Sequence, residues 1–355
     1  AAMRGEARVV VGTRSAVFLP LPQAGLIVVD EEHDGSYKQQ DGIRYHARDF
    51  ALVRGKALDV PVLLGSATPS LESLQNAIAG RHLHLRLSQR AGNARPPAVR
   101  VVDVRKRPLD AGLSPELLTA IERALADGGQ VLVFRNRRGY APVLLCHDCG
   151  WSAHCPRCST PERGHRMTVH AGGRRLQCHH CGHTEPTPQF CPECGAEGSL
   201  TAIGPGVERV QEEAALLFPE ARRLVMASDT IPGPAAAAEA ARQIAEREVD
   251  LVIGTQIVAK GWHFPHLTLV GVVDADLGLA GGDLRAAERT VQLLHQVSGR
   301  AGRAESPGRV MLQSWVPDHP VMMALVSGDL DSFMAEEASA RRPGGWPPFE
   351  IGRAH

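Results

Sequence analysis

The sequence predicts an α/β protein with two parallel-sheet lobes and a two-zinc, cysteine-rich insertion in the second lobe. Short apolar runs without polar alternation are typical of parallel strands that are covered on both faces. Helical segments alternate with these runs along the chain, and all eight cysteines fall between Cys146 and Cys194. At 355 residues the chain is long enough for about two domains, each with its own core.

Composition limits the partners that this chain can attract through its bulk charge. Lys plus Arg and Asp plus Glu number 39 each, so any DNA contact must come from a local basic patch. No apolar run approaches the roughly 20 residues of a membrane span, and Ala1–Arg14 lacks the hydrophobic segment of a signal peptide. We therefore expect a cytoplasmic protein without a membrane partner, in a reducing compartment that keeps thiolates available for metal.

The first lobe begins with two expected strands. Arg8–Ser15 has the composition of a strand that runs into a polar turn, and Gly25–Val29 is a short apolar strand that ends in Asp30-Glu31-Glu32-His33. Carboxylates at the carboxyl end of a parallel strand lie where α/β sheets bind ligands. One carboxylate can hold the magnesium of a nucleotide, and its neighbour can orient or deprotonate the attacking water. On these four residues alone, a solvated acidic turn is an equally good interpretation.

A third strand, Val60–Leu64, is followed by Gly65-Ser66-Ala67-Thr68-Pro69 and by a helix from Ser70 to Ile78. The segments Asp30–His33 and Gly65–Pro69, in this order and at this separation, resemble motifs II and III of superfamily 2 helicases. The resemblance implies that Asp30 binds magnesium and Glu31 activates water. It further implies that the nucleotide site is coupled to the nucleic-acid path through Ser66, Ala67 and Thr68.

The loop Gly35–His46 lies between these two motifs and mixes aromatic, cationic and amide side chains. Aromatic rings stack on bases of any sequence, and Lys38 and Arg44 can contact phosphates. An ordinary polar loop with two exposed tyrosines is the alternative. Its position directly after the acidic residues favours a loop that contacts DNA and reports this to the nucleotide site.

The eight cysteines form four Cys-x-x-Cys pairs: Cys146/Cys149, Cys155/Cys158, Cys178/Cys181 and Cys191/Cys194. Two such pairs supply the four thiolates of a tetrahedral zinc site, so four pairs predict two zinc ions. Disulfides are the alternative, but cysteines confined to one short stretch favour a metal site. The pairs can share ions either sequentially or in a nested order. The histidines among them are expected to be surface groups or groups that contact the metal ligands, not ligands themselves.

The expected domain organisation follows from the proline-rich segments and the position of the cysteines. Residues 1–88 form the C-terminal part of the first lobe, and 89–114, with Pro96-Pro97 and Pro108, form a linker. Residues 115–342 form the second lobe, which the cysteine segment 145–200 interrupts, and 343–355 begin a further C-terminal domain. The elements expected in the second lobe are helices over 115–127, 208–217, 235–246 and 285–297 and strands over 131–134, 224–226, 251–253 and 269–273.

Two segments of the second lobe, Gly254–Gly261 and Gln296–Arg303, resemble helicase motifs V and VI. Guanidinium groups that reach across a cleft to the transferring phosphate stabilise the charge that develops during hydrolysis. Arg300 and Arg303 have the spacing for this role. Such a pair alone is commonly part of a surface, but within Gln-x-x-Gly-Arg-x-Gly-Arg it is much more specific.

Over nearly its whole length the chain resembles the PriA family of primosomal replication-restart helicases, and the cysteine insertion after Arg137–Pro142 singles out this family. The resemblance implies two RecA-like lobes and an ATP-dependent 3′-to-5′ DNA helicase that uses ATP and Mg²⁺ and carries two structural Zn²⁺. It implies forked and single-stranded DNA, primosome proteins and single-strand-binding proteins as partners. It also implies nested zinc sites, one with Cys146, Cys149, Cys191 and Cys194 and one with Cys155, Cys158, Cys178 and Cys181. A non-catalytic zinc-binding scaffold for fork recognition and primosome assembly is the alternative.

The resemblance also assigns binding residues and marks a departure. Besides Asp30, Glu31, Gln296, Arg300 and Arg303 as catalytic groups, the cofactor-binding residues are Asp30, Gly261, Arg300 and Arg303. The implied DNA-binding residues are Thr13, Arg14, Tyr37, Lys38, Gln39, Arg44, Tyr45, Thr255, Gln256 and Lys260. No phosphate-binding Gly-x-x-x-x-Gly-Lys-Ser/Thr is found, since Gly55-Lys56 is followed by Ala57. We therefore expect a fragment with an incomplete first lobe that hydrolyses little ATP by itself.

Overall fold

The computed structural model describes residues 4–87, 96–110, 112–135, 143–159, 167–170, 174–178, 181–203, 214–227, 230–231, 233–259, 261–279, 283–302 and 308–346. The chain forms two compact units, Ala1–Arg86 with Ala338–His355 (unit 1) and Leu87–Glu337 (unit 2). Within the described ranges, none of the helices has the length and apolar character that crossing a bilayer requires.

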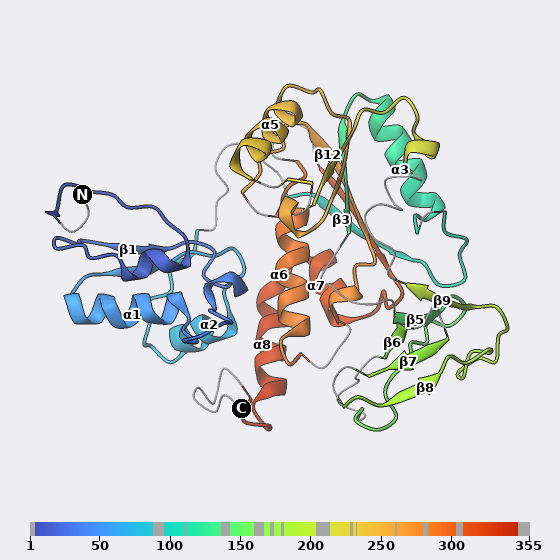
Figure 1. The fold of residues 1–355 in the computed structure, drawn as a ribbon, viewed down its shortest axis with the longest axis horizontal. Helices are drawn as coiled ribbons and strands as arrows, with labels where there is room; N and C mark the ends of the chain where they lie inside the picture. The colour runs from blue at the N-terminus through green and yellow to red at the C-terminus, as the bar shows by residue number, and fades with distance from the viewer. Residues whose placement is uncertain are drawn as a thin grey trace. The chain divides into compact units, whose positions relative to one another are not determined.

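Unit 1 contains a parallel β-α-β arrangement followed by a second helix (Figure 1). Strands β1 (Ile27–Val29) and β2 (Val62–Leu64) pair in parallel, and α1 (Ala47–Leu58) connects them. Helix α2 (Leu71–Ile78) begins after Ser70, whose hydroxyl accepts a hydrogen bond from the Ser73 amide. Unit 1 also contains two short 3-10 helices, η2 (Arg14–Phe18) and η3 (Gly35–Tyr37).

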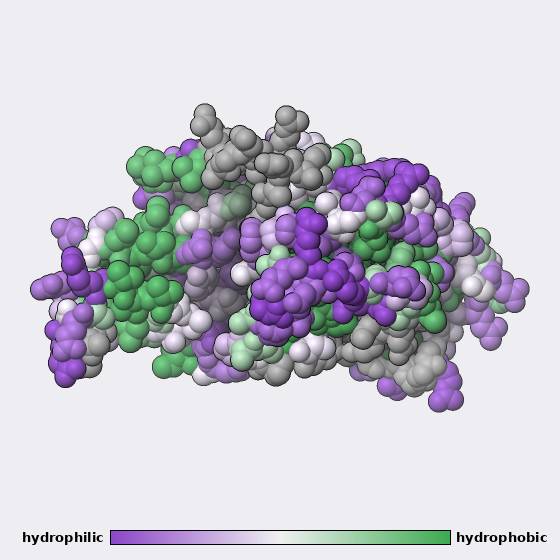
Figure 2. Space-filling model, turned by 90° about the horizontal axis from the view of Figure 1, so that it is seen from above, coloured by the Kyte–Doolittle hydropathy of each residue, from purple (hydrophilic) through white to green (hydrophobic). Residues whose placement is uncertain are grey.

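Two expectations for unit 1 are wrong. Arg8–Ser15 is not a strand, because it pairs with no strand of the described chain and turns into η2 at Arg14. Strands β1 and β2 are parallel as expected, but they are not covered on both faces, since Val28 is 55% and Leu63 48% exposed. Figure 2 shows apolar side chains gathered at the surface of unit 1, toward the left of the view.

Unit 2 is built on a six-stranded, fully parallel sheet with the order β10-β11-β4-β12-β13-β3. Helices and short 3-10 helices connect its strands, and α7 and α8 follow the last strand in the sequence (Figure 1). The strands are β3 (Ala98–Asp103), β4 (Gln130–Arg135), β10 (Arg223–Met226), β11 (Leu251–Gly254), β12 (Leu267–Val273) and β13 (Arg309–Ser314). The helices are α3 (Pro115–Ala126), α5 (Pro234–Ala245), α6 (Ala286–Ser298), α7 (Pro320–Ser327), η4 (Gln256–Ala259) and η5 (Leu277–Leu279), and α8 (Leu330–Arg341) begins in unit 2 and ends in the residues grouped with unit 1.

The parallel α/β class is confirmed, and so are the strands predicted from apolar runs. Residues Val131–Phe134 are all at most 1% exposed, because successive side chains of β4 point to opposite covered faces. On one face Leu117 and Ile121 of α3 pack against Val131 and Val133. Of the helix expected over 208–217, only 214–217 are described, and these residues are helical.

The expected linker 89–114 contains part of the sheet instead. Residues Ala98–Asp103 form β3, which pairs in parallel with β13 at the edge of the sheet. Val102 and the following Val104 lie in the unit's hydrophobic core. The flanking prolines suggested a linker, but proline is compatible with residues just outside an edge strand. Most of the expected C-terminal segment, 347–355, lies outside the described residues.

The cysteine segment forms a second, antiparallel sheet with the order β8-β7-β6-β5-β9. Its strands are β5 (Val143–Cys146), β6 (Thr168–His170), β7 (Arg175–Gln177), β8 (Thr184–Pro186) and β9 (Leu200–Ile203). Leu144, Met167 and Leu176 form a small core of its own. Leu145, which points to the opposite face of β5, belongs to the core of the parallel sheet, so the insertion is anchored to that sheet.

Candidate helicase motifs and metal centre

The eight cysteines converge into two groups of four, and the pairing is nested. The outer group is Cys146, Cys149, Cys191 and Cys194, and the inner group is Cys155, Cys158, Cys178 and Cys181. Within each group all sulfur atoms lie within 4.8 Å of one another. Of the two pairings that spacing alone leaves open, the sequential one is therefore wrong.

Distances between the sulfur atoms fit a shared metal ion rather than disulfides. The Sγ atoms of Cys146 and Cys194 are 3.7 Å apart, and those of Cys158 and Cys178 are 3.5 Å apart. A disulfide requires about 2.05 Å, whereas zinc bonds of about 2.3 Å in a tetrahedron place the sulfurs about 3.8 Å apart. All eight cysteines are free, and thiolates are the ligands that structural zinc prefers. The residues present therefore fit two zinc ions.

Tight turns bring the two thiols of each pair to the same side. The amides of Gly150, Gly182 and Gly195 each donate to the carbonyl of the first cysteine of the preceding pair, at 2.8–3.0 Å. All three glycines have φ between 72° and 80°, a conformation that other residues adopt at a cost. In the outer group the Trp151 amide also donates to Cys149 Sγ, which stabilises a thiolate there.

The acidic motif lies at the carboxyl end of β1, where the chain makes an unusual turn. Asp30 Oδ1 accepts a hydrogen bond from the Glu31 amide at 3.0 Å, and Glu31 has a left-handed φ of 48°. Glu31 Oε2 is buried and accepts no hydrogen bond from any described residue, and His33 Nδ1 lies 3.6 Å from it. Oε2 is thus a buried carboxylate oxygen without a hydrogen-bond donor among the described residues, and it can act as a general base only once a water molecule reaches it.

A hydrogen bond joins the two motifs that are separated in sequence. His33 Nδ1 and Ser66 Oγ lie 2.7 Å apart, and Ser66 Oγ also accepts from the Thr68 amide at 2.9 Å. Gly65 lies beside Asp30, and a Cβ atom on this glycine would be in ordinary van der Waals contact with Asp30 Oδ1, at 3.4 Å. Ala67 remains exposed beside it. Ser66 and Thr68 lie within one hydrogen-bonded segment next to the acidic motif.

In the loop Gly35–His46 both tyrosines are engaged within unit 1. The Tyr37 hydroxyl donates to the Asp30 carbonyl at 2.7 Å, and burial, reinforced by Asp34, raises the pKa of Tyr37. The ring of Tyr45 contacts Phe18 edge-to-face, with centroids 4.8 Å apart. These tyrosines therefore support the loop instead of projecting from it.

The cationic residues of this region divide into a structural and an exposed group. Arg14, which follows Thr13, donates to the carbonyls of Ser36 and Lys38, each at 3.1 Å, and so holds the loop in place. The backbone N–H of Gln39 donates a hydrogen bond to the Tyr45 carbonyl at 2.8 Å. Lys38 and Arg44 are exposed, so they are the side chains of this loop that can contact phosphates.

In unit 2, Arg300 connects the two segments that resemble motifs V and VI. It follows α6 and donates from Nη1 to the Trp262 carbonyl at 2.6 Å and from Nη2 to the Ala259 carbonyl. Thr255 is buried, Gln256 opens η4, and Gly261 has a φ of 70°. Gln296 lies on α6, whereas Lys260 and Arg303 lie outside the described residues.

Two buried ion pairs were not predicted from the sequence. Glu32 is 1% exposed and pairs with Arg48, and Arg135 at the end of β4 pairs with Asp274, which follows β12, at 2.9 Å. Burial raises the pKa of Asp274, while Arg135 opposes this shift. Charged residues at the ends of apolar strands indicate that such pairs exist. The partners could not be identified from the sequence, because the two residues of each pair are far apart in it.

Comparisons with known proteins agree with the arrangement of the cysteines. Residues 155–186 match the family model described as the PriA DNA helicase Cys-rich region (CRR) domain. The replication restart protein PriA of Rickettsia conorii is 47% identical over 97% of this chain and 53% of its own length. That of Bacillus subtilis is 42% identical over 98% of this chain and 43% of its own length. The chain thus spans about half of the length of the curated relatives that it matches.

Solved structures show weaker likeness. RecG bound to a three-way DNA junction is 14% identical, covers 92% of this chain and 31% of that chain, and gives a TM-score of 0.44. At this level of similarity no conclusion about function follows.

Proposed function

Because the chain belongs to the PriA family of replication restart proteins, we propose that it supplies motor and zinc-binding parts of an ATP-dependent 3′-to-5′ DNA helicase. The complete protein would act at stalled or repaired forks, on forked and single-stranded DNA, and would assemble with primosome and single-strand-binding proteins. The observation that carries the proposal is the hydrogen bond between His33 and Ser66 beside Glu31, whose buried Oε2 accepts no hydrogen bond from the described residues.

The acidic motif has the groups that nucleotide hydrolysis requires. Asp30 is exposed at the end of β1, where its carboxylate would hold Mg²⁺, which neutralises phosphate charge when bound. Glu31 would orient the attacking water and take its proton through Oε2, which accepts no hydrogen bond from the described residues. The hydrogen bond between His33 and Ser66 would link this chemistry to Ala67 and Thr68.

Residues of unit 2 would complete the hydrolytic machinery. Gln296, Arg300 and Arg303 stay proposed contributors, with Gly261 at the nucleotide. Since the guanidinium of Arg300 binds the carbonyls of Ala259 and Trp262, its contribution would include holding this segment in place. Arg303 would stabilise the charge of the transferring phosphate.

Contacts to DNA are proposed on both units. Lys38 and Arg44 would bind phosphates from a loop that Arg14, Tyr37, Gln39 and Tyr45 support. Thr255, Gln256 and Lys260 would contact the strand from unit 2, and Thr13 would contact it from unit 1. Two structural Zn²⁺ would hold the cysteine segment in the form that the sulfur positions indicate.

The test uses the complete protein that contains this chain. ATP hydrolysis is measured with and without single-stranded DNA, and unwinding is compared on duplexes with 3′ or 5′ single-stranded tails. Glu31→Gln should lower DNA-stimulated hydrolysis by about 10²- to 10⁴-fold, the usual contribution of a general base. The control Glu122→Gln changes an exposed glutamate on α3 and should leave hydrolysis unchanged.

Retention of hydrolysis by Glu31→Gln would contradict the assigned role. A wild-type protein that binds forked DNA without hydrolysing ATP would instead favour the non-catalytic scaffold.

A further inference from the structure

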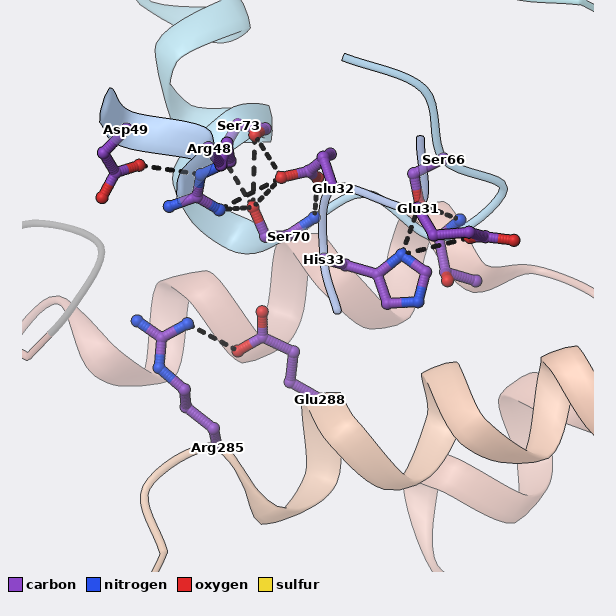
Figure 3. A network of polar contacts seen from close by, with 11 residues as sticks. Glu31, Glu32, His33, Arg48, Asp49, Ser66, Ser70, Ser73, Arg285 and Glu288 are labelled. Atoms are coloured by element: carbon purple, nitrogen blue, oxygen red, sulfur yellow. Dashed lines mark hydrogen bonds and ion pairs between the residues drawn. The ribbon is translucent and has the colours of Figure 1, made fainter. Parts of the chain in front are cut away.

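Glu32 is held by more polar contacts than either acidic neighbour, although it takes no part in the proposed hydrolysis. Its Oε1 accepts from the Ser70 amide at 2.6 Å (Figure 3). Its Oε2 accepts from the hydroxyls of Ser70 and Ser73, each at 2.9 Å, and from Arg48 Nη1 at 3.1 Å. With four donors on a side chain that is 1% exposed, this carboxylate is fixed in one orientation.

Of the partners of Glu32, Arg48 and Ser70 are buried and Ser73 is half-buried, and they belong to two other elements. Arg48, on α1, also donates to the Ser70 hydroxyl at 2.7 Å and to Asp49 at 2.8 Å (Figure 3). Ser70 is the N-cap of α2, and Ser73 lies in the first turn of that helix. The carboxylate therefore ties the end of β1 to both helices of unit 1.

The backbone around Glu32 links this anchor to the acidic motif and to the Ser66 segment. The Glu32 amide donates to the Gly65 carbonyl at 3.0 Å, and the Gly65 amide donates to the Val29 carbonyl at 2.9 Å. Between these bonds, Glu31 is held at a φ of 48°. A left-handed conformation of a residue other than glycine persists only where its surroundings impose it, and Glu32 is the adjacent buried anchor.

We propose that Glu32 is a positioning residue that keeps Glu31 in its turned conformation and keeps the start of α2 in register with it. Any displacement of the Gly65–Pro69 segment by DNA would pass to α2 and, through Glu32, to the Glu31 backbone. This inference rests on the proposed ATPase function and adds a second connection beside the hydrogen bond between His33 and Ser66.

The test is the ratio of DNA-stimulated to DNA-free ATP hydrolysis in the complete protein. Glu32→Gln keeps the shape of the side chain but replaces an acceptor oxygen by an NH₂ donor that faces the Arg48 donor. Since small misplacements in an active site cost up to about 10²-fold, we expect the ratio to fall by about 10- to 100-fold. Ser73→Ala removes one of the four contacts and should lower the ratio less.

Asp49→Asn is the matched control, because Asp49 shares Arg48 but its side chain is 58% exposed and does not contact Glu32. It should leave the ratio unchanged. The ratio does not depend on the fraction of folded protein. If Glu32 only stabilised the fold, Glu32→Gln would therefore lower the melting temperature and leave the ratio unchanged.

The outcomes separate this inference from the proposed function. Absence of DNA-stimulated hydrolysis in the wild-type protein would contradict the function itself. A wild-type ratio retained by Glu32→Gln would overturn the positioning role alone. Should Glu32→Gln not fold, an unchanged ratio in Ser73→Ala would overturn it, and a reduced ratio would support it.

Discussion

His46 directly precedes α1, and its imidazole is partly buried near the guanidinium of Arg48. Burial, and after it Arg48, lowers the pKa of His46 to about 4, while Asp49 and Glu32 act in the opposite direction and Lys38 reinforces the lowering. The unfolded chain has an ordinary histidine pKa of about 6.5. The folded ring is therefore neutral at a pH where the unfolded ring is already protonated.

This difference predicts a pH dependence of stability. Between about pH 6.5 and pH 4 the unfolded state binds the additional proton, so the contribution of His46 is fully present above pH 6.5 and is lost as the pH falls toward 4. Because the ring is only partly buried, we expect a loss of at most about 2 kcal/mol. Hydrogen exchange of the α1 amides at pH 7 and pH 5 measures it.

His46→Gln is the control, since glutamine does not titrate and any acid release of zinc affects both proteins equally. The difference in α1 stability between pH 7 and pH 5 should be smaller in the variant than in the wild type. Equal differences would mean that His46 does not titrate with a lowered pKa.

At the residue scale, the sequence predicted side chains whose chemistry is tied to a short local pattern. The cysteine pairs and Asp30-Glu31 belong to this class, because spacing or position after a strand suffices to recognise them. The role of Glu32 was not predictable, since its partners Arg48, Ser70 and Ser73 converge only in the fold. The contact between the rings of Tyr45 and Phe18 was not predicted for the same reason.

At the scale of elements, the turn from β11 into η4 depends on a close approach at Gly254. A Cβ atom at this position would lie 2.3 Å from Cγ1 of Val258, which is fully buried. Gly254→Ala should therefore force η4 away from the sheet and destabilise unit 2 by about 1–3 kcal/mol, as overpacking of a core typically does. Urea unfolding followed by the signal of the parallel sheet measures this cost.

Gly25→Ala serves as the control, because a Cβ atom there meets nothing within 4 Å and φ is not positive. It should leave the urea midpoint unchanged. A Gly254→Ala protein as stable as the wild type would mean that Val258 moves aside without cost.

Strands were predictable where apolar residues are continuous, as in β4, β11 and β12, because both faces of the central sheet are covered. Strand β3 was missed because it lies at an edge and between prolines. The opposite error at Arg8–Ser15 has a related cause: valines favour strands, but a strand needs a hydrogen-bonded neighbour, and Val11 is 93% exposed. Composition alone does not supply the neighbour.

At the scale of the whole molecule, the two cysteine groups hold different parts of the chain together. The outer group includes Cys146, which ends β5 beside Leu145 of the parallel-sheet core. The carbonyl of the next residue, His147, accepts a hydrogen bond from the Lys106 amide at 2.6 Å. The His147 ring contacts Trp315 edge-to-face, with ring centroids 5.0 Å apart. The inner group instead includes Cys155 and Cys178, which lie in the separate core of the antiparallel sheet.

This division predicts different consequences for the loss of each metal ion. Metal analysis of the wild-type chain should give about two zinc ions, and each of the double variants Cys158→Ser/Cys178→Ser and Cys149→Ser/Cys194→Ser should retain about one. Structural zinc is coupled to folding, so the inner variant should lose hydrogen-exchange protection in β6 and β7. The outer variant should lose it first in β5 and β9, where the insertion joins the parallel sheet. Strands β4, β11 and β12 contain no thiolate and should stay protected in both. A wild-type value near one zinc, or loss of the same strands in both variants, would contradict two independent sites with separate structural roles.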